Sequence, residues 1–220
     1  MMKEATAFVV ATLPFLWQGL AMTLFVSLVV VGLSLLIGIL FGIGFAYGPW
    51  WLRLPLRAFS DILRGTPLLV VIFTIYYLLP FAGLNLQPLP AVLLALTLFK
   101  TAHVSEIVRG AIQSIPPGQT DAGKAIGLSF AQRLAYVILP QAVRRFLPPW
   151  INSVTDAVKG SALVSLVGIV DLMLAAQQVI GRTYAPLPVY LLAAGIYFVI
   201  NYSLSSLSRG LEARFAYIRE

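Results

Sequence analysis

Long stretches without any charged side chain alternate along this sequence with shorter stretches that carry basic residues. Residues 5–52, 65–99 and 183–208 contain no Lys, Arg, Asp or Glu. A helix needs about 20 predominantly apolar residues to cross the hydrocarbon core of a bilayer. Each stretch is therefore long enough for at least one span, and the pattern predicts an all-α integral membrane protein.

Five membrane spans follow from these stretches. The first stretch gives an amphipathic or interfacial entry and then a span near 20–47. Prolines and glycine break the second stretch into a hairpin with spans near 66–80 and 89–108, because proline interrupts a helix. A less regular apolar segment gives the fourth span near 140–170, and the last stretch gives the fifth near 187–208.

The basic residues give the orientation of these spans. If five spans alternate, twelve of the 15 basic residues fall on one side, within 48–65, 100–149 and the C-terminal tail. Cytoplasmic loops carry the excess of Lys and Arg, so we expect the N-terminus outside and the C-terminus in the cytoplasm. This distribution explains the net charge of +7 without a nucleic-acid partner.

Composition narrows the chemistry. The chain is 60% hydrophobic and 10% charged, whereas soluble domains are about 45–50% apolar. The absence of cysteine excludes disulfides, thiolate metal sites and a cysteine nucleophile, and a single histidine cannot form a histidine cluster. The eight acidic residues are scattered, so they offer no convergent set of acids for a membrane enzyme, and we predict no metal site.

The segment after the third predicted span has the local chemistry of a helix, a turn and a second helix. Thr120 can cap a short helix that begins at Asp121, whose carboxylate suits a helix N-terminus. Gly127 stands where a left-handed helix stop would fall. Ser129 and Gln132 form a capping box for the second helix. On this pattern alone, the segment is either a compact docking surface or a simple connector.

Several motifs together resemble one transporter family. Residues 121–140 read DAGKAIGLSFAQRLAYVILP, which is similar to the EAA loop of bacterial ATP-binding-cassette (ABC) importer permeases, with Asp for the usual Glu and Gly123 for the usual second Ala. Further motifs resemble the polar amino acid permeases. They are LRGTPLLV at 63–70, EIVRGAIQSIPPGQ at 106–119, LPQAVRRFLPPWIN at 139–152 and YFVINYSLSSLSRGLE at 197–212.

This resemblance implies a subunit that is not itself an enzyme. The chain would be a single type I permease domain, residues 1–220, in the bacterial inner membrane, with a cytoplasmic coupling loop at about 111–138. Two permease subunits, identical or closely related, would form the route for a polar amino acid. Separate ATPase subunits would carry ATP and Mg, and an extracytoplasmic binding protein would deliver the solute. The chain itself has no GxxxxGK[ST] phosphate loop, and no cofactor is expected on it.

The resemblance assigns the ATPase-coupling role to a group of residues in the loop. These are Asp121, Ala122, Gly123, Gly127, Leu128 and Phe130.

The candidate residues of the substrate pathway are polar or charged side chains near or within the spans. These are Thr66, Asn152, Asp156, Lys159, Ser161, Tyr197 and Asn201. A charge inside a span is expensive and usually faces a cavity or a partner. Asp156 and Lys159 could also simply pair with each other, since they are three residues apart. Members of the family often carry Asp after this Lys, and Gly160 in its place makes a cationic substrate side chain a weaker expectation.

Two polar stripes have a second possible explanation. Tyr197, Asn201 and Ser205 repeat every four residues on the last span, and residues 97, 101 and 105 do so on the third. Small polar residues commonly hydrogen-bond between membrane helices, so either stripe could hold helices together instead of lining the pathway.

Five positions have local chemistry that favours structural roles. We expect Glu106 and Arg109 to pair where the third span leaves the membrane, and His103 to be packed or next to the pore rather than a metal ligand. Thr66 can cap the second span, with Pro67 in its first turn.

A self-gated channel and a membrane enzyme are the alternatives to an importer subunit. A channel would need no ATPase but would leave the loop chemistry unexplained. Co-purification of an ATPase would favour the importer.

Overall fold

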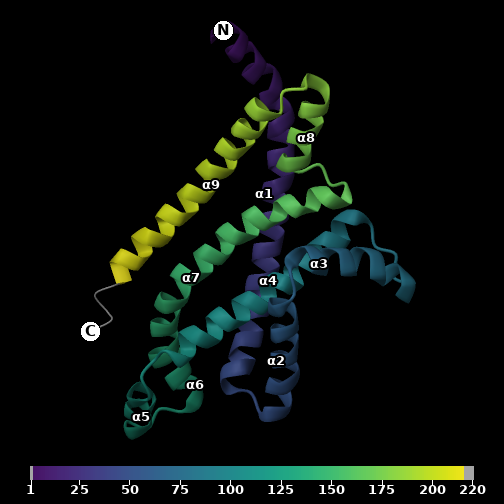
Figure 1. Ribbon diagram of the computed structural model, residues 1–220. Coiled ribbons are helices and arrows are strands. Elements are labelled where there is room, and N and C mark those ends of the chain that lie inside the picture. The colour runs from purple at the N-terminus through teal and green to yellow at the C-terminus, as the bar shows by residue number, and fades with distance from the viewer. Residues whose placement is uncertain (1, 216–220) are drawn as a thin grey trace.

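The computed structural model describes the backbone of residues 2–215 and the side chains of residues 10–214, and no strand occurs in this part of the chain (Figure 1). The long helices are α1 (Met2–Tyr47), α2 (Trp50–Gly65), α4 (Pro88–Gln113), α7 (Leu139–Gly160), α8 (Leu172–Thr183) and α9 (Pro186–Phe215). The shorter ones are α3 (Leu68–Phe73), α5 (Pro117–Ala125) and α6 (Phe130–Gln132). Short π or 3₁₀ segments are η1 (Thr74–Leu78), η2 (Leu79–Ala82), η3 (Arg133–Ile138) and η4 (Ser161–Val167).

The all-helical membrane class predicted from the sequence is confirmed. Three helices, within α1, α4 and α9, are long and apolar enough to cross a membrane. Two bent pairs bring the number to as many as five if each pair is one span. One pair joins Trp50–Gly65 to Leu68–Ala82 at 110°, and the other joins Phe130–Val167 to α8 at 52°.

The first span differs from the sequence prediction in its length. No separate entry segment precedes it, because α1 continues as one helix through Pro14. Its apolar part alone, Val10–Tyr47, has 38 residues. At 1.5 Å per residue that is about 57 Å, well beyond the roughly 30 Å hydrocarbon core. The helix therefore extends past the bilayer.

Two segments predicted as loops are helices. Residues 50–65 form α2, a strongly amphipathic helix. Ser60 is its one buried residue. The Ser60 hydroxyl donates to the carbonyl of Ala102 on α4 at 3.4 Å. The predicted external loop after residue 170 contains α8, which Asp171 caps by accepting a hydrogen bond from the Leu174 amide at 2.9 Å. A search for charge-free apolar stretches does not detect α2 or α8, because both helices also carry charged residues.

Helix α4 is the centre of the structure, and its most extensive contact is with α1. Glycines on α1 allow the close approach. A Cβ placed on Gly38 would lie 2.6 Å from Cγ1 of Val104, and one on Gly42 would lie 2.4 Å from Cβ of Val108. Small residues at a membrane helix interface let two backbones approach closely in this way.

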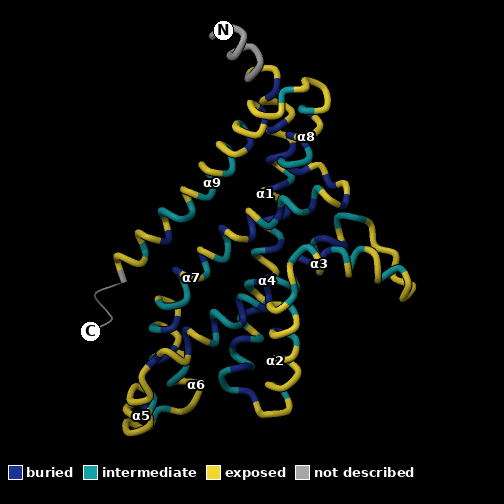
Figure 2. Tube along the Cα trace, viewed as in Figure 1, coloured by how far each residue is buried: buried dark blue, intermediate teal, exposed yellow. Residues whose placement is uncertain are grey.

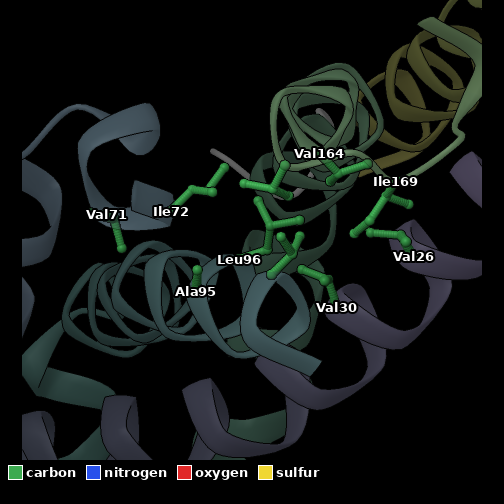
Figure 3. Close-up of a cluster of buried hydrophobic side chains, with 10 residues drawn as sticks. Val26, Val30, Val71, Ile72, Ala95, Leu96, Val164 and Ile169 are labelled. Carbon is green, nitrogen blue, oxygen red and sulfur yellow. The ribbon is translucent and has the colours of Figure 1, made fainter. Parts of the chain in front are cut away.

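The main buried apolar cluster joins four parts of the chain (Figure 3). Val26 and Val30 come from α1, Val71 and Ile72 from α3, Ala95 and Leu96 from α4, and Val164 and Ile169 from η4 and the turn after it. The cluster fixes the bent pairs against the two central helices.

Helix α9 is much less covered than α4. Within the apolar windows of these helices, 61% of α4 and 11% of α9 is buried, and Figure 2 shows α9 as largely exposed. Its first half packs through Val189 and Ala193 against α8 and α1. Further along, the Ser208 hydroxyl donates to the carbonyl of Pro148 on α7 at 3.2 Å. Much of α9 thus faces outward from this single chain.

Candidate functional site

The 111–138 loop folds into a compact unit at one end of the molecule, between α4 and α7 (Figure 1). Helix α5 ends at a turn in which Gly127 has φ +80°. The turn is closed by hydrogen bonds from the Gly127 amide to the carbonyl of Lys124 at 2.9 Å and from the Leu128 amide to that of Gly123 at 3.0 Å. The predicted left-handed stop at Gly127 is confirmed.

The second helix of the loop begins as its sequence predicts. The Gln132 amide donates to Oγ of Ser129 at 3.4 Å, and the Ser129 amide donates to Oε1 of Gln132 at 2.8 Å. Both halves of the capping box are therefore present. The helix continues as the π segment η3, which leads directly into α7.

The predicted start of the first helix is wrong. Helix α5 begins at Pro117, so Thr120 lies inside it and caps nothing. Proline suits the first helical position, because its fixed φ matches the helix and its missing N–H would have no partner there. Asp121 instead forms an exposed ion pair with Lys124 at 2.9 Å.

The predicted coupling residues divide into an outward and an inward set. Asp121, Ala122, Gly127 and Phe130 are exposed. Gly123 is buried, and a Cβ there would lie 3.0 Å from Cγ of Arg133. Leu128 is half-buried and its carbonyl accepts a hydrogen bond from Nη1 of Arg133 at 2.7 Å. The inward residues shape the loop, and the outward ones are free to meet another protein.

Apolar side chains form a large part of that outward surface. Ile126 is 77% exposed and Tyr136 is 74% exposed. Phe130 is half exposed and also packs edge-on against the ring of Tyr47 on α1, with centroids 5.2 Å apart. Exposed apolar groups clustered on a loop mark an interaction surface.

The loop is firmly attached to the helix bundle. Ile112, Ile115, Ile138 and Ala142 form a buried cluster that joins the end of α4 to the start of α7. The Arg145 guanidinium also donates to the carbonyl of Ser114. The loop is thus packed directly onto the end of α4 and the start of α7.

A pocket of about 390 Å³ lies between α2, α4 and α7. It brings the predicted pathway residues Asn152 and Asp156 together with charged side chains from the other two helices. The lining residues are Arg64, Lys100, His103, Glu106, Ile107, Pro149, Asn152, Ser153 and Asp156. This volume is within the range of about 300–1,000 Å³ typical of small-molecule sites.

The acidic groups of the pocket have basic partners. Asp156 pairs with Lys159 at 2.9 Å, and these side chains are 62% and 58% exposed. Glu106 pairs with Arg109 at 2.6 Å and lies 3.8 Å from Arg64. Both pairings agree with the sequence expectation.

His103 presents only one ring nitrogen to the pocket. Its Nδ1 donates to the carbonyl of Phe99 at 2.9 Å, because a carbonyl can only accept, which leaves Nε2 available. Among the described residues, no group of three or more His, Cys, Asp or Glu side chains could hold a metal ion.

Lys100 was misplaced by the sequence analysis. It was counted with the cytoplasmic segment, but it lies near the middle of α4 and is only 6% exposed. One cation thereby moves from the loop into the span. The signal was available in the sequence, since a charge inside a predicted span is by default a functional candidate.

The other predicted pathway residues do not line this pocket. Thr66 donates to the carbonyl of Ile62 at 2.7 Å, and it does not cap the next helix, which begins after Pro67. The buried Ser161 donates to the carbonyl of Val158 at 2.8 Å. Both hydroxyls therefore donate to carbonyl groups at the C-terminal ends of their own helices, α2 and α7.

The polar stripe on α9 does not line the pocket: Tyr197 joins helices, whereas Asn201 bonds within α9 and its buried Oδ1 has no partner in the described part of the chain. The Tyr197 hydroxyl lies 3.5 Å from Oδ2 of the buried Asp171, as donor to acceptor, and Nδ2 of Asn201 donates to the carbonyl of Tyr197 at 2.7 Å. Thr23 of α1 reaches the same junction by accepting from the Leu172 amide at 3.1 Å. The sequence analysis missed Asp171, which no motif marks.

The stripe on α4 is buried against neighbouring helices. The Ser105 hydroxyl donates within α4 to the carbonyl of Ala102 at 2.9 Å. The hydroxyls of Thr97 and Thr101 have no hydrogen-bond partner within the described part of the chain. Hydrogen bonds between helices are thus not the role of this stripe in the single chain.

A larger cavity, of about 690 Å³, lies closer to the 111–138 loop, between α4, α7 and α9. Arg144, Arg145 and Glu212 contribute the charged part of its lining. It continues the polar face of α4 and α7 from the smaller pocket toward the loop, because Ile107 and Pro149 line both.

Known proteins are similar to this chain in sequence and in fold. A probable glutamine ABC transporter permease protein GlnP of Bacillus subtilis is 36% identical over 206 residues, which are 92% of this chain and 94% of that protein. The glutamine transport system permease protein GlnP of Escherichia coli is 35% identical over 204 residues, covering 92% and 93%. A crystal structure of an amino acid ABC transporter with histidines matches with a TM-score of 0.88 and 33% identity, covering 94% of this chain and 96% of that one.

The family model of the binding-protein-dependent transport system inner membrane component matches residues 34–217. That range includes the pocket, the 111–138 loop and the last three long helices. The resemblance drawn from the sequence motifs is confirmed, and this chain belongs to the family of inner membrane components of binding-protein-dependent transport systems.

Proposed function

We propose that this chain is the permease subunit of an ATP-driven importer that moves a polar amino acid across the bacterial inner membrane. The observation that carries the proposal is the pocket between α2, α4 and α7. A free amino acid has an ammonium and a carboxylate, and this pocket offers an acidic and a basic group within a volume of about 390 Å³.

The two ends of the substrate would find different partners. Asp156 and the amide oxygen of Asn152, one turn apart on α7, accept hydrogen bonds from the ammonium. Arg64 and Lys100 on the opposite helices donate to carboxylate. Charge-assisted hydrogen bonds of this kind are the stronger ones, so they suit a site that excludes apolar solutes. The names of the relatives support an amino acid as the substrate class.

The outward face of the 111–138 loop supports a partner ATPase. The phosphate loop motif is absent from this sequence, so ATP and Mg would be held by separate subunits. Ile126 and Phe130 offer exposed apolar anchors, and Asp121 and Lys124 surround them with charge. An apolar centre with a polar rim is the usual anatomy of a protein interface.

A second permease subunit would cover the exposed side of α9, either as a copy of this chain or as a relative. An extracytoplasmic binding protein would deliver the solute from the side of the η2–α4 hairpin. In this orientation the N-terminus is outside and the C-terminus is cytoplasmic. The basic residues that support it lie on the cytoplasmic side and include Arg219, whereas Lys3 lies on the outer side; neither residue is among the described side chains.

The test is uptake into vesicles that contain the permease, its ATPase and, if needed, its partner permease. A panel of radiolabelled amino acids is offered with the cognate binding protein, with ATP or a non-hydrolysable analogue inside. We expect uptake of a polar amino acid that requires hydrolysis. Uptake or conductance that is equal without the ATPase would instead show a self-gated channel.

A further inference from the structure

Lys100 is the one charged pocket residue that is buried and lacks an ion-pair partner within the described part of the chain. It is 6% exposed, and the ion pairs of the described residues include none that involves it. The charged groups that act on it electrostatically are Asp156 and Lys159. A cation held inside a membrane helix is costly unless it meets an anion, so this position is prepared for a negatively charged group that comes from outside the chain.

The carboxylates of the pocket are already engaged by other cations. Glu106 accepts two hydrogen bonds from Arg109, at 2.9 and 2.6 Å. Asp156 lies 2.9 Å from Lys159. The lining carries two basic side chains, Arg64 and Lys100, and the same number of acidic ones. Because Arg109 and Lys159, which do not line the pocket, already pair with the two acidic side chains, a zwitterion with one carboxylate would leave one of the two lining cations without an anion.

We propose that Lys100 binds the side-chain carboxylate of the substrate, so that this permease selects an anionic amino acid of the glutamate or aspartate type. The inference rests on the proposed function and adds the charge of the substrate to it.

The two carboxylates of such a substrate match the two cations that line the pocket. Arg64 is 42% exposed and is 3.8 Å from Glu106, beyond hydrogen-bond distance, so its guanidinium can turn to the α-carboxylate. Lys100 lies deeper and takes the second carboxylate. The ammonium of the substrate still faces Asp156 and Asn152.

Neutral and cationic side chains fit this arrangement less well. A glutamine amide could accept one hydrogen bond from Lys100, but it would leave the buried charge without a counter-ion. A lysine or arginine side chain would add a further cation beside Lys100. Close charge pairs removed from water contribute at least about tenfold to affinity, so the charge of the side chain should change affinity by at least that factor.

Glutamate and glutamine are a matched pair for the test, because they have the same shape and differ by one charge. Binding of each is measured by calorimetry to the purified permease–ATPase complex in lipid nanodiscs. No binding protein is present, so its own specificity does not enter. The variants are Lys100→Met, which removes the charge, Lys100→Arg, which keeps it, and Arg57→Met, a matched loss of one exposed basic group on α2.

In the unmodified complex we expect glutamate to bind at least about tenfold more tightly than glutamine. Lys100→Met should bring the ratio of the two affinities close to one, while Lys100→Arg and Arg57→Met retain the preference. The ratio does not depend on the fraction of active protein, so partial misfolding of a variant does not alter it. If Lys100→Met fails to assemble, Lys100→Gln, a second variant without the charge, takes its place and should bring the ratio close to one in the same way.

Two results would overturn the inference and leave the proposed function standing. One is glutamine binding as tightly as glutamate in the unmodified complex. The other is an equal loss of both affinities in Lys100→Met, which would show that Lys100 meets the α-carboxylate common to all amino acids. Absence of ATP-dependent uptake of any amino acid in the vesicle assay would instead overturn the proposed function itself.

Discussion

Replacement of Gly127 by valine should uncouple the 111–138 loop from its proposed ATPase partner. Gly127 has φ +80°, and a Cβ added there would meet nothing within 4 Å. The cost of valine is therefore conformational and not steric. Left-handed backbone costs an L-residue about 1–2 kcal/mol, and a β-branched side chain is especially unsuited to it.

That magnitude is small for the fold but large for a docking surface. A penalty of about 1–2 kcal/mol changes a population ratio by roughly 5–30-fold. The buried cluster of Ile112, Ile115 and Ile138 keeps the base of the loop in place, so the strain should be relieved at the turn. Relief there reorients α6 and the exposed Phe130 relative to α5.

The assay is pull-down of the ATPase together with substrate-stimulated ATP turnover in reconstituted membranes. We expect both to fall in Gly127→Val while membrane insertion is unchanged. Gly127→Asn should retain more of both, because asparagine tolerates the left-handed region. Gly118→Val is the matched control, since Gly118 also has open space around it but no positive φ. Full association and stimulation in Gly127→Val, or an equal loss in Gly118→Val, would refute the reasoning.

Three further changes test other parts of the structure. Lys159→Ala should reduce uptake more than assembly, because an exposed ion pair contributes less than about 1 kcal/mol to stability; restoration of normal uptake by adding Asp156→Asn would limit the pair to a structural role. In the permease produced without its ATPase, a cysteine at Ile126 should resist a membrane-impermeant thiol reagent in intact cells and react in inverted vesicles, and the reverse would overturn the orientation. Gly42→Ala should destabilise the purified protein by about 1–3 kcal/mol through overpacking, whereas Gly32→Ala, in open space on the same helix, should not lower its melting temperature.

The local chemistry of the 111–138 loop could be predicted because it depends on neighbours in sequence. Gly127 and the Ser129–Gln132 capping box act within a few residues of themselves, and both were confirmed. The prediction for the start of α5 was wrong, although it also depended on neighbours in sequence. Two local signals competed there, and Pro117 took precedence over Thr120.

The pocket could be predicted only in part, because its walls come from distant segments. Asn152 and Asp156 were identified as polar residues in an apolar helix, but nothing local pairs them with Lys100 on α4. Tyr197 has the same polar character and yet lies near the buried Asp171. Periodicity places a side chain on a face of its own helix, while packing decides which helix that face meets.

The attachment of the 111–138 loop has a consequence for mechanical transmission. Helix α4 carries the loop anchor at Ile112 and the pocket residue Lys100 on one uninterrupted rod. Twelve residues separate them, or about 18 Å of helix, so a tilt of about 10° at the anchor displaces the pocket wall by about 3 Å. A displacement of that size is enough to make or break a hydrogen bond. A modest rotation of the loop can therefore change the contacts between the pocket and a bound molecule through α4 alone, without a conformational change in another helix.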